Sequence, residues 1–223
     1  ADKREDFEEP LEDTITKAMG KICAIDSRRW IQTILSEFMP GTVSDATEEE
    51  RRLMLEMFQY TVWPTNSTKD PHDYSDLEGD MASIRENPVM CQEICDILQY
   101  NLDHLDFVDE NVDLGFTCPL DLHCHYTKDQ ILVALGHPER AKSMRQGVLY
   151  LKDRNLDFFI NTLNKADKDY SPTTMYADYS INEHLFHWQS QSTTSEASNT
   201  GQRYIHHKEM GSQIFLFVRE YNK

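Results

Sequence analysis

The spacing of apolar residues changes once along the chain, and this change limits the folds that the chain can adopt. From Leu11 to about His104, apolar residues recur every three or four positions, which is the period of one face of an α-helix. After Gly136-His137-Pro138 they alternate with polar residues or run continuously, as in β-strands. We therefore expect an α+β protein in which a small helical bundle is followed by a mainly β region.

The helical half should contain about four amphipathic helices. Thr47 followed by three glutamates is typical of a helix start, because a hydroxyl can cap the first amides and negative charge interacts favourably with the helix dipole. The segment Thr65–Asp80 is rich in Asp, Ser, Asn and Pro and is expected to be a loop. Apolar sets at helical spacing are Ile15, Ala18, Met19 and Ile22; Trp30, Ile31, Ile34, Leu35 and Phe38; Leu53, Met54, Met57, Phe58 and Val62; and Met90, Ile94, Ile97, Leu98 and Leu102.

The second half should form a curved sheet or a barrel. Thr127, with Gln130 three residues later and Gly136 beyond it, first predicts one short helix. The tract Ser192–Gly201 consists mainly of small polar residues and is expected to be an exposed loop. Strands are expected at 147–151, 156–163, 175–181, 185–191 and 214–220, and five strands of such lengths usually roll into a curved sheet or barrel.

The two halves of the chain also differ in net charge. Residues 1–120 contain 10 Lys and Arg against 27 Asp and Glu, a net charge of −17, whereas residues 121–223 contain 12 of each. We place the domain boundary in the acidic stretch Asp106–Gly115, which gives a helical connector domain at 1–115 and a β-rich domain at 116–223. Phosphate contacts dominate nucleic-acid affinity, so the acidic half is a poor candidate for DNA binding and the neutral half remains a candidate.

Several sequence features bear on the cellular compartment of the protein and on whether the chain is part of a longer one. Five cysteines, an odd number without regular spacing, favour a reducing compartment. The chain has neither a signal peptide nor an apolar run long enough to span a bilayer, so we expect a cytoplasmic protein. The acidic start ADKREDFEEP resembles a linker, and we expect the chain to be a fragment of a longer protein.

The sequence gives little support for catalysis within this fragment. Ser190 or Ser192 with His187 or His206 leaves a hydrolytic arrangement open, but no nucleophile elbow or Walker loop accompanies it. No metal or other cofactor is expected. Four potential zinc ligands are close in sequence but lack a familiar ligand spacing, namely Cys118, His123, Cys124 and His125.

The stretch Leu185–Thr194 has the composition of a base-binding pocket. Phe186, His187 and Trp188 are followed by six amide or hydroxyl side chains without a charge. Rings offer stacking surface and neutral polar groups offer directional hydrogen bonds, which together suit a flat heterocycle such as a nucleobase. The same rings are equally consistent with the inward side of a buried strand.

Two charged residues near this stretch have alternative interpretations. Asp178 lies between Tyr176 and Tyr179, and a carboxylate can accept the exocyclic amino hydrogens of cytosine. Arg203, beside Tyr204, suits a phosphate or a base edge. Arg203 is equally suited to an ion pair within the fold, with Asp178 or Glu183.

Residues 122–221 contain the segments LHCHYTKDQILVALG, GVLYL, DFFINTLNKADKDYSPTTMYADYSINEHLFHWQSQSTT, GQRYIHH and IFLFVREY. This part of the chain resembles the C-terminal domain of proteins that join a phospholipase-D-type nuclease to a superfamily 2 helicase, among them type IV restriction endonucleases. The resemblance implies a target-recognition domain with an SRA-like or PUA-like fold. Such a domain would bind double-stranded DNA containing 5-methylcytosine or 5-hydroxymethylcytosine by base flipping. The helicase and nuclease domains of the same polypeptide would lie outside this fragment.

Transferred to this sequence, the resemblance implies two groups of site residues. The modified-base pocket would consist of Tyr176, Asp178, Tyr179, Phe186, Trp188 and Gln189. Contacts to DNA would come from Thr173, Thr174, Ser190, Gln191, Ser192, Arg203, Tyr204, Lys165 and Lys168. The alternative function is that of a protein-interaction or autoinhibitory module, which docks on a helicase motor through the acidic helical half.

Overall fold

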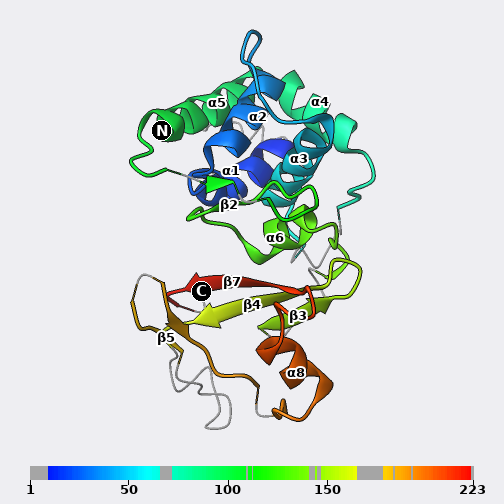
Figure 1. The fold of residues 1–223 in the computed structure, drawn as a ribbon. Coiled ribbons are helices and arrows are strands. Elements are labelled where there is room, and N and C mark those ends of the chain that lie inside the picture. The colour runs from blue at the N-terminus through cyan, green and yellow to red at the C-terminus, as the bar shows by residue number, and fades with distance from the viewer. Residues whose placement is uncertain are drawn as a thin grey trace, which may run out of the picture. The chain divides into compact units, whose positions relative to one another are not determined.

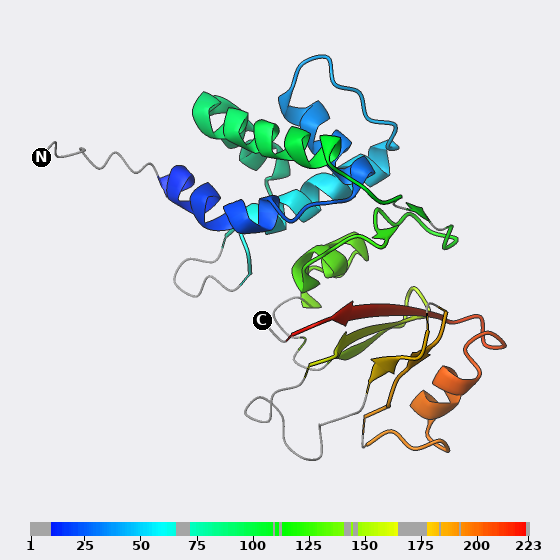
Figure 2. The same cartoon turned by 90° about the vertical axis from the view of Figure 1, so that its left-hand side faces the viewer.

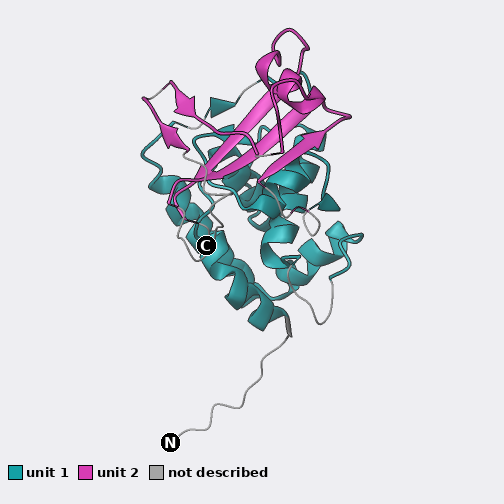
Figure 3. Ribbon diagram, turned by 90° about the horizontal axis from the view of Figure 1, so that it is seen from below, with its two compact units in different colours: residues 1–143 teal, residues 144–223 magenta. Residues whose placement is uncertain are grey.

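The chain folds into two compact units, residues 1–143 and residues 144–223 (Figure 3). The computed structural model describes residues 10–65, 72–108, 110–111, 113–140, 144, 147–164, 178–182, 184–191 and 193–221. Within these residues it confirms the α+β class, because the first unit is largely helical and the second contains the longest strands (Figure 1).

The first unit is built around helix α3, which packs against α1, α2, α4 and α6, while α5 packs against α1, α2 and α4. Its described elements are α1 (Pro10–Ile22), α2 (Arg28–Phe38), α3 (Glu48–Val62), α4 (Leu77–Glu86), α5 (Pro88–Asp103), β1 (Glu110–Asn111), β2 (Asp121–Leu122) and α6 (Lys128–Ala134). The four long helices expected from apolar spacing are thus confirmed, and their apolar faces meet in one core that includes the fully buried Trp30 and Phe58.

Capping residues fix where these helices begin. Thr127 and Gln130 form a reciprocal capping box at the start of α6, as their spacing predicted. Thr47 caps α3 as expected, and its pairing with Glu50 makes a second capping box. Of the expected loop 65–80, residues 66–71 lie outside the described residues, and α4 begins at Leu77 within its last residues. The Asp76 carboxylate accepts a hydrogen bond from the amide of Gly79 and caps this helix.

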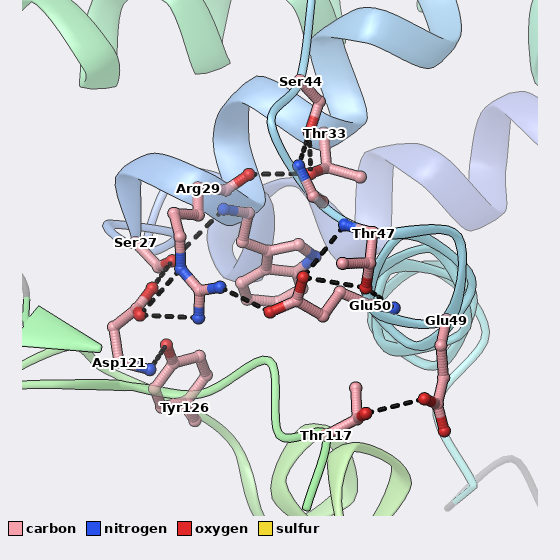
Figure 4. Close-up of polar contacts among 12 residues, drawn as sticks. Ser27, Arg29, Thr33, Ser44, Thr47, Glu49, Glu50, Thr117, Asp121 and Tyr126 are labelled. Atoms are coloured by element: carbon pink, nitrogen blue, oxygen red, sulfur yellow. Dashed lines mark hydrogen bonds and ion pairs between the residues drawn. The ribbon is translucent and has the colours of Figure 1, made fainter. Parts of the chain in front are cut away.

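A buried polar cluster ties the segment after residue 115 to the helical unit (Figure 4). The Asp121 carboxylate accepts hydrogen bonds from the Ser27 hydroxyl at 2.7 Å and from Nε of Arg29 at 3.0 Å. Arg29 also donates to Glu50 on α3 at 2.9 Å, and the amide of Asp121 donates to the Tyr126 hydroxyl at 2.9 Å. Because the side chain of Asp121 is only 1% exposed, these bonds replace water that the carboxylate has lost.

Helix α6 belongs to the same compact unit. Gln130 donates to the Thr61 hydroxyl at 2.7 Å, and Asp129 accepts from the Thr65 hydroxyl at 2.7 Å. The compact units therefore divide near residue 143, whereas the sequence placed the domain boundary near residue 115. Compactness and evolutionary domains follow different criteria, so the division into domains at 1–115 and 116–223 stays a prediction.

The second unit contains a three-stranded sheet in the order β3-β4-β7, formed by β3 (Val148–Leu151), β4 (Leu156–Thr162) and β7 (Gln213–Arg219). β3 pairs with β4 antiparallel, and β4 pairs with β7 parallel, from Leu156 opposite Gln213 to Thr162 opposite Arg219. A short antiparallel pair, β5 (Tyr179–Ser180) and β6 (Phe186–His187), and helix α8 (Asn199–Ile205) lie on one side of this sheet (Figure 2).

This arrangement corrects part of the expected β architecture. The described residues form no closed barrel, and the strands expected at 175–181 and 185–191 shrink to the two-residue β5 and β6, with residues 175–177 outside the described part. The expected loop 192–201 contains the start of α8, because the Ser198 hydroxyl caps the amide of Gly201. The SRA-like or PUA-like fold therefore stays a prediction. Among the described residues, no helix has the length and apolar character needed to cross a membrane.

Candidate functional site

One face of the sheet in the second unit gathers polar and aromatic side chains. Side chains alternate along a strand, so Asp157 and Phe159 of β4 point to the same face. Tyr150 of β3 is paired opposite Asp157 and shares that face. Arg203 and Tyr204 of α8 contact these residues, as the interactions below show. The site is thus assembled from two neighbouring strands and one short helix.

Three rings form a contiguous aromatic cluster on this face. Trp188, just after β6, stacks on Phe159 with centroids 4.3 Å apart and planes 11° apart. Tyr204 meets both rings edge-on, at 5.1 Å from Phe159 and 5.3 Å from Trp188. Offset stacks and edge-to-face pairs are the favoured aromatic geometries, so Trp188 is held in a fixed orientation although it is only partly buried.

Beside the rings lies an ion pair with two hydrogen bonds. Arg203 donates from Nε to Oδ2 of Asp157 at 2.6 Å and from Nη2 to Oδ1 at 2.8 Å. The guanidinium also lies 3.7 Å above the centre of the Tyr150 ring. Asp157 is therefore the partner of Arg203, in place of the Asp178 or Glu183 that the sequence left open.

The electrostatics follow from this pairing. The hydrogen bonds to Asp157 raise the pKa of Arg203 above its ordinary value and outweigh the effect of burial, which lowers it. Burial is the main cause that raises the pKa of the neighbouring Tyr204, and the negative charge of Asp157 adds to it. Arg203 therefore stays charged, and the Tyr204 hydroxyl stays protonated, at neutral pH.

Two adjoining cavities open next to these groups. The first, which we call the ring cavity, has a volume of about 400 Å³ and is lined by Trp188, Ser190, Thr194, Ser195, Glu196, Gly201, Tyr204 and Ile205. The second, which we call the hydroxyl cavity, has a volume of about 330 Å³ and is lined by Val148, Leu149, Tyr150, Asp157, Gln191, Thr193, Thr194, Ser198, Thr200, Arg203 and Tyr204. Thr194 and Tyr204 line both cavities, so the two are neighbours.

The structure brings together five of the residues predicted for the site. These residues, which line one or both cavities, are Trp188, Ser190, Gln191, Arg203 and Tyr204. Six others lie outside the described residues, namely Lys165, Lys168, Thr173, Thr174, Tyr176 and Ser192.

The other described residues of the predicted pocket do not line either cavity, namely Asp178, Tyr179, Phe186 and Gln189. Asp178 is 9% exposed, and its Oδ1 accepts a hydrogen bond from the amide of Gln189 at 2.9 Å, which fixes the chain beyond β6. Tyr179 is 50% exposed and stacks on His187 across the β5–β6 pair, with centroids 4.7 Å apart. Phe186, also on β6, is partly buried but does not line either cavity.

Several residues of the site carry little signal in the sequence. The pattern around Tyr150, Asp157 and Phe159 indicates only strands, and the composition around Thr200 indicates only a loop. One signal was present, because Asp157 interrupts an apolar strand and a charge at a buried strand position needs a partner. Its partner is 46 residues away, too far for sequence spacing to identify.

Comparison with known proteins gives one match. A protein-family model described as a domain of unknown function (DUF3427) matches residues 120–223, which cover α6, the whole second unit and both cavities. None of the curated proteins and none of the solved structures compared with the chain matches it.

Proposed function

We propose that the second unit recognises double-stranded DNA carrying 5-methylcytosine or 5-hydroxymethylcytosine and accepts the modified base, turned out of the duplex, in the ring cavity. The chain would then be the target-recognition part of a modification-dependent restriction endonuclease. Its helicase and nuclease domains would lie outside residues 1–223, and this part would bind DNA without cutting it.

The ring cavity is the observation that carries the proposal. Trp188 is braced by Phe159 from one side and Tyr204 from its edge, so a ring in the cavity meets aromatic surface that needs no rearrangement. Ser190 and Thr194 add neutral hydrogen-bonding groups to the same cavity. Its volume of about 400 Å³ falls in the range of small-molecule pockets.

The energies are compatible with base flipping. Turning one nucleotide out of the stack costs a few kcal/mol, and stacking on an aromatic side chain returns about 1–3 kcal/mol per base. Burial of one methyl group adds only about 0.8 kcal/mol, so stronger discrimination would also need the unmodified base to leave a polar group of the site unpaired. We therefore expect a preference for methylated DNA of about tenfold rather than many thousandfold.

A binding experiment on the full chain tests the proposal. Fluorescence anisotropy would compare two duplexes of one sequence, with a single central cytosine or 5-methylcytosine. The unaltered chain should prefer the methylated duplex, and Trp188→Ala should remove the preference because the stacking surface is lost. Tyr179→Ala is the matched control, since this exposed ring lies outside both cavities. Equal affinity of the unaltered chain for the two duplexes would contradict the proposal.

A second candidate function rests on the charge of the first half. Residues 1–120 carry a net charge of −17, which disfavours binding to DNA and favours binding to a basic surface of another protein. In this alternative the chain docks on a helicase motor, as an interaction or autoinhibitory module. It predicts no retention of either duplex and a complex with the isolated motor that salt dissociates, as measured by gel filtration at low and high salt.

A further inference from the structure

The hydroxyl cavity is larger than either small modification of cytosine requires. Its volume of about 330 Å³ equals that of about ten water molecules at roughly 30 Å³ each. A methyl or hydroxymethyl group on a base in the neighbouring ring cavity would fill only a small part of it. The cavity therefore has room for a substituent of the size of a whole ring.

The lining of this cavity suits a neutral ligand with many hydroxyl groups. Gln191, Thr193 and Thr200 supply groups that both donate and accept hydrogen bonds. Among the described residues of the lining, the only charged side chains are those of Arg203 and Asp157, which neutralise each other. A phosphate would meet no net positive charge there, because two nitrogens of Arg203 already donate hydrogen bonds to the Asp157 carboxylate. A sugar carries no charge and needs many donors and acceptors.

The hydroxyl cavity adjoins the ring cavity, so a sugar bound there could be attached to a base in the ring cavity. Thr194 and Tyr204 form part of both cavities, so a group on the edge of a base in the ring cavity can extend directly into the hydroxyl cavity. Tyr204 also adds aromatic surface to the lining, against which the C–H groups of a sugar can pack.

We infer that the hydroxyl cavity binds a hexose attached to the 5-hydroxymethyl group of cytosine, so that this chain recognises glucosylated as well as simply modified DNA. The inference rests on the proposed function, since the base itself occupies the ring cavity. It widens the substrate class from small substituents to bulky, neutral, polyhydroxylated ones.

The test uses the full chain and four duplexes of one sequence, whose central base is cytosine, 5-methylcytosine, 5-hydroxymethylcytosine or glucosylated 5-hydroxymethylcytosine. Anisotropy should give an affinity for the glucosylated duplex equal to, or higher than, that for the hydroxymethylated duplex. Thr200→Leu should lower the affinity for the glucosylated duplex by about tenfold, because a longer apolar side chain fills the cavity and removes a hydroxyl. The same variant should lower the affinity for the other two modified duplexes by less, because a methyl or hydroxymethyl group fills only a small part of this cavity.

Thr200→Ser is the matched control, because it keeps the hydroxyl and the space, and thermal unfolding verifies that both variants are folded. Rejection of the glucosylated duplex by the unaltered chain, with the preference for methylated DNA intact, overturns the inference alone. Unchanged binding of the glucosylated duplex by Thr200→Leu overturns the assignment to this cavity. Equal binding of all four duplexes overturns the proposed function, and the inference with it.

Discussion

At the scale of single residues, the site depends on one buried charge pair. Asp157 is 1% exposed, so its carboxylate has lost nearly all contact with water and relies on Arg203 for both oxygens. A buried pair of this kind is seldom more stabilising than apolar residues of equal size. What it provides is geometry, because two parallel hydrogen bonds fix α8 against β4 and thereby place Tyr204 beside Trp188.

Asp157→Asn should therefore destabilise the second unit by about 3 kcal/mol, because it leaves the Arg203 charge largely buried without a counter-charge. The double variant Asp157→Leu with Arg203→Met, which removes both charges, should recover most of this loss in urea unfolding. Asp13→Asn is the control, since its ion pair with Lys17 on α1 is exposed and should change stability by less than about 1 kcal/mol. Similar costs for the single and the double variant would show that charge pairing does not govern stability here.

At the scale of elements, the helices with long apolar stripes were predictable and the short ones were not. The apolar residues of α2 repeat over three turns, and burial against α3 and α5 follows from that stripe alone. α8 has only seven residues, follows the capping residue Ser198 and contains Gly201, so its sequence has the composition of a loop. Contacts of Arg203 and Tyr204 with the sheet hold it in place, and these contacts cannot be seen in local sequence.

The pairing of the strands, like the position of α8, depends on contacts between distant residues and could not be predicted from local sequence. The three long strands were found from their apolar residues, but the parallel pairing of β4 with β7 joins segments more than 50 residues apart. The aromatic stretch around Trp188 correctly indicated part of the cavity lining, because rings next to small polar groups have a recognisable composition. The assignment of Asp178 and Tyr179 to the same pocket followed from their closeness in sequence, and the structure places them outside both cavities.

Gly201→Ala tests how α8 shapes the ring cavity. A methyl group at this position would lie 2.1 Å from the carbonyl oxygen of Ser195 and 3.2 Å from Cα of Glu196, so the backbone before α8 must move. We expect loss of stability in urea unfolding and weaker binding of methylated duplex, because Gly201, Ser195 and Glu196 all line this cavity.

Gly20→Ala is the matched control for this change. Gly20 lies near the end of α1 with open space around its Cα, so alanine should be neutral or stabilise the helix by up to about 1 kcal/mol. If Gly201→Ala bound methylated DNA as tightly as the unaltered chain, the ring cavity would not be the site of base recognition.

At the scale of the whole molecule, the acidic charge and the two cavities are separated along the chain. The excess of acidic residues lies in residues 1–120, whereas both cavities belong to residues 144–223 and the lining of the hydroxyl cavity has no net charge. Contacts with phosphates depend strongly on salt because binding releases counterions. Stacking on Trp188 and hydrogen bonds to neutral side chains of the ring cavity do not depend on salt in this way. Overall affinity and base preference should therefore respond differently to salt.

We expect the affinity for any duplex to fall as salt rises from about 50 mM to about 200 mM, while the ratio of affinities for methylated and unmethylated duplex stays constant within about twofold. Anisotropy titrations of both duplexes at each salt concentration measure this ratio directly. Trp188→Ala should lower the ratio toward one at every salt concentration and leave the salt dependence of overall affinity unchanged, because it removes stacking and no charge. A ratio that falls in step with affinity would instead place discrimination in charge contacts with the DNA backbone, and stacking in the ring cavity would then have no part in it.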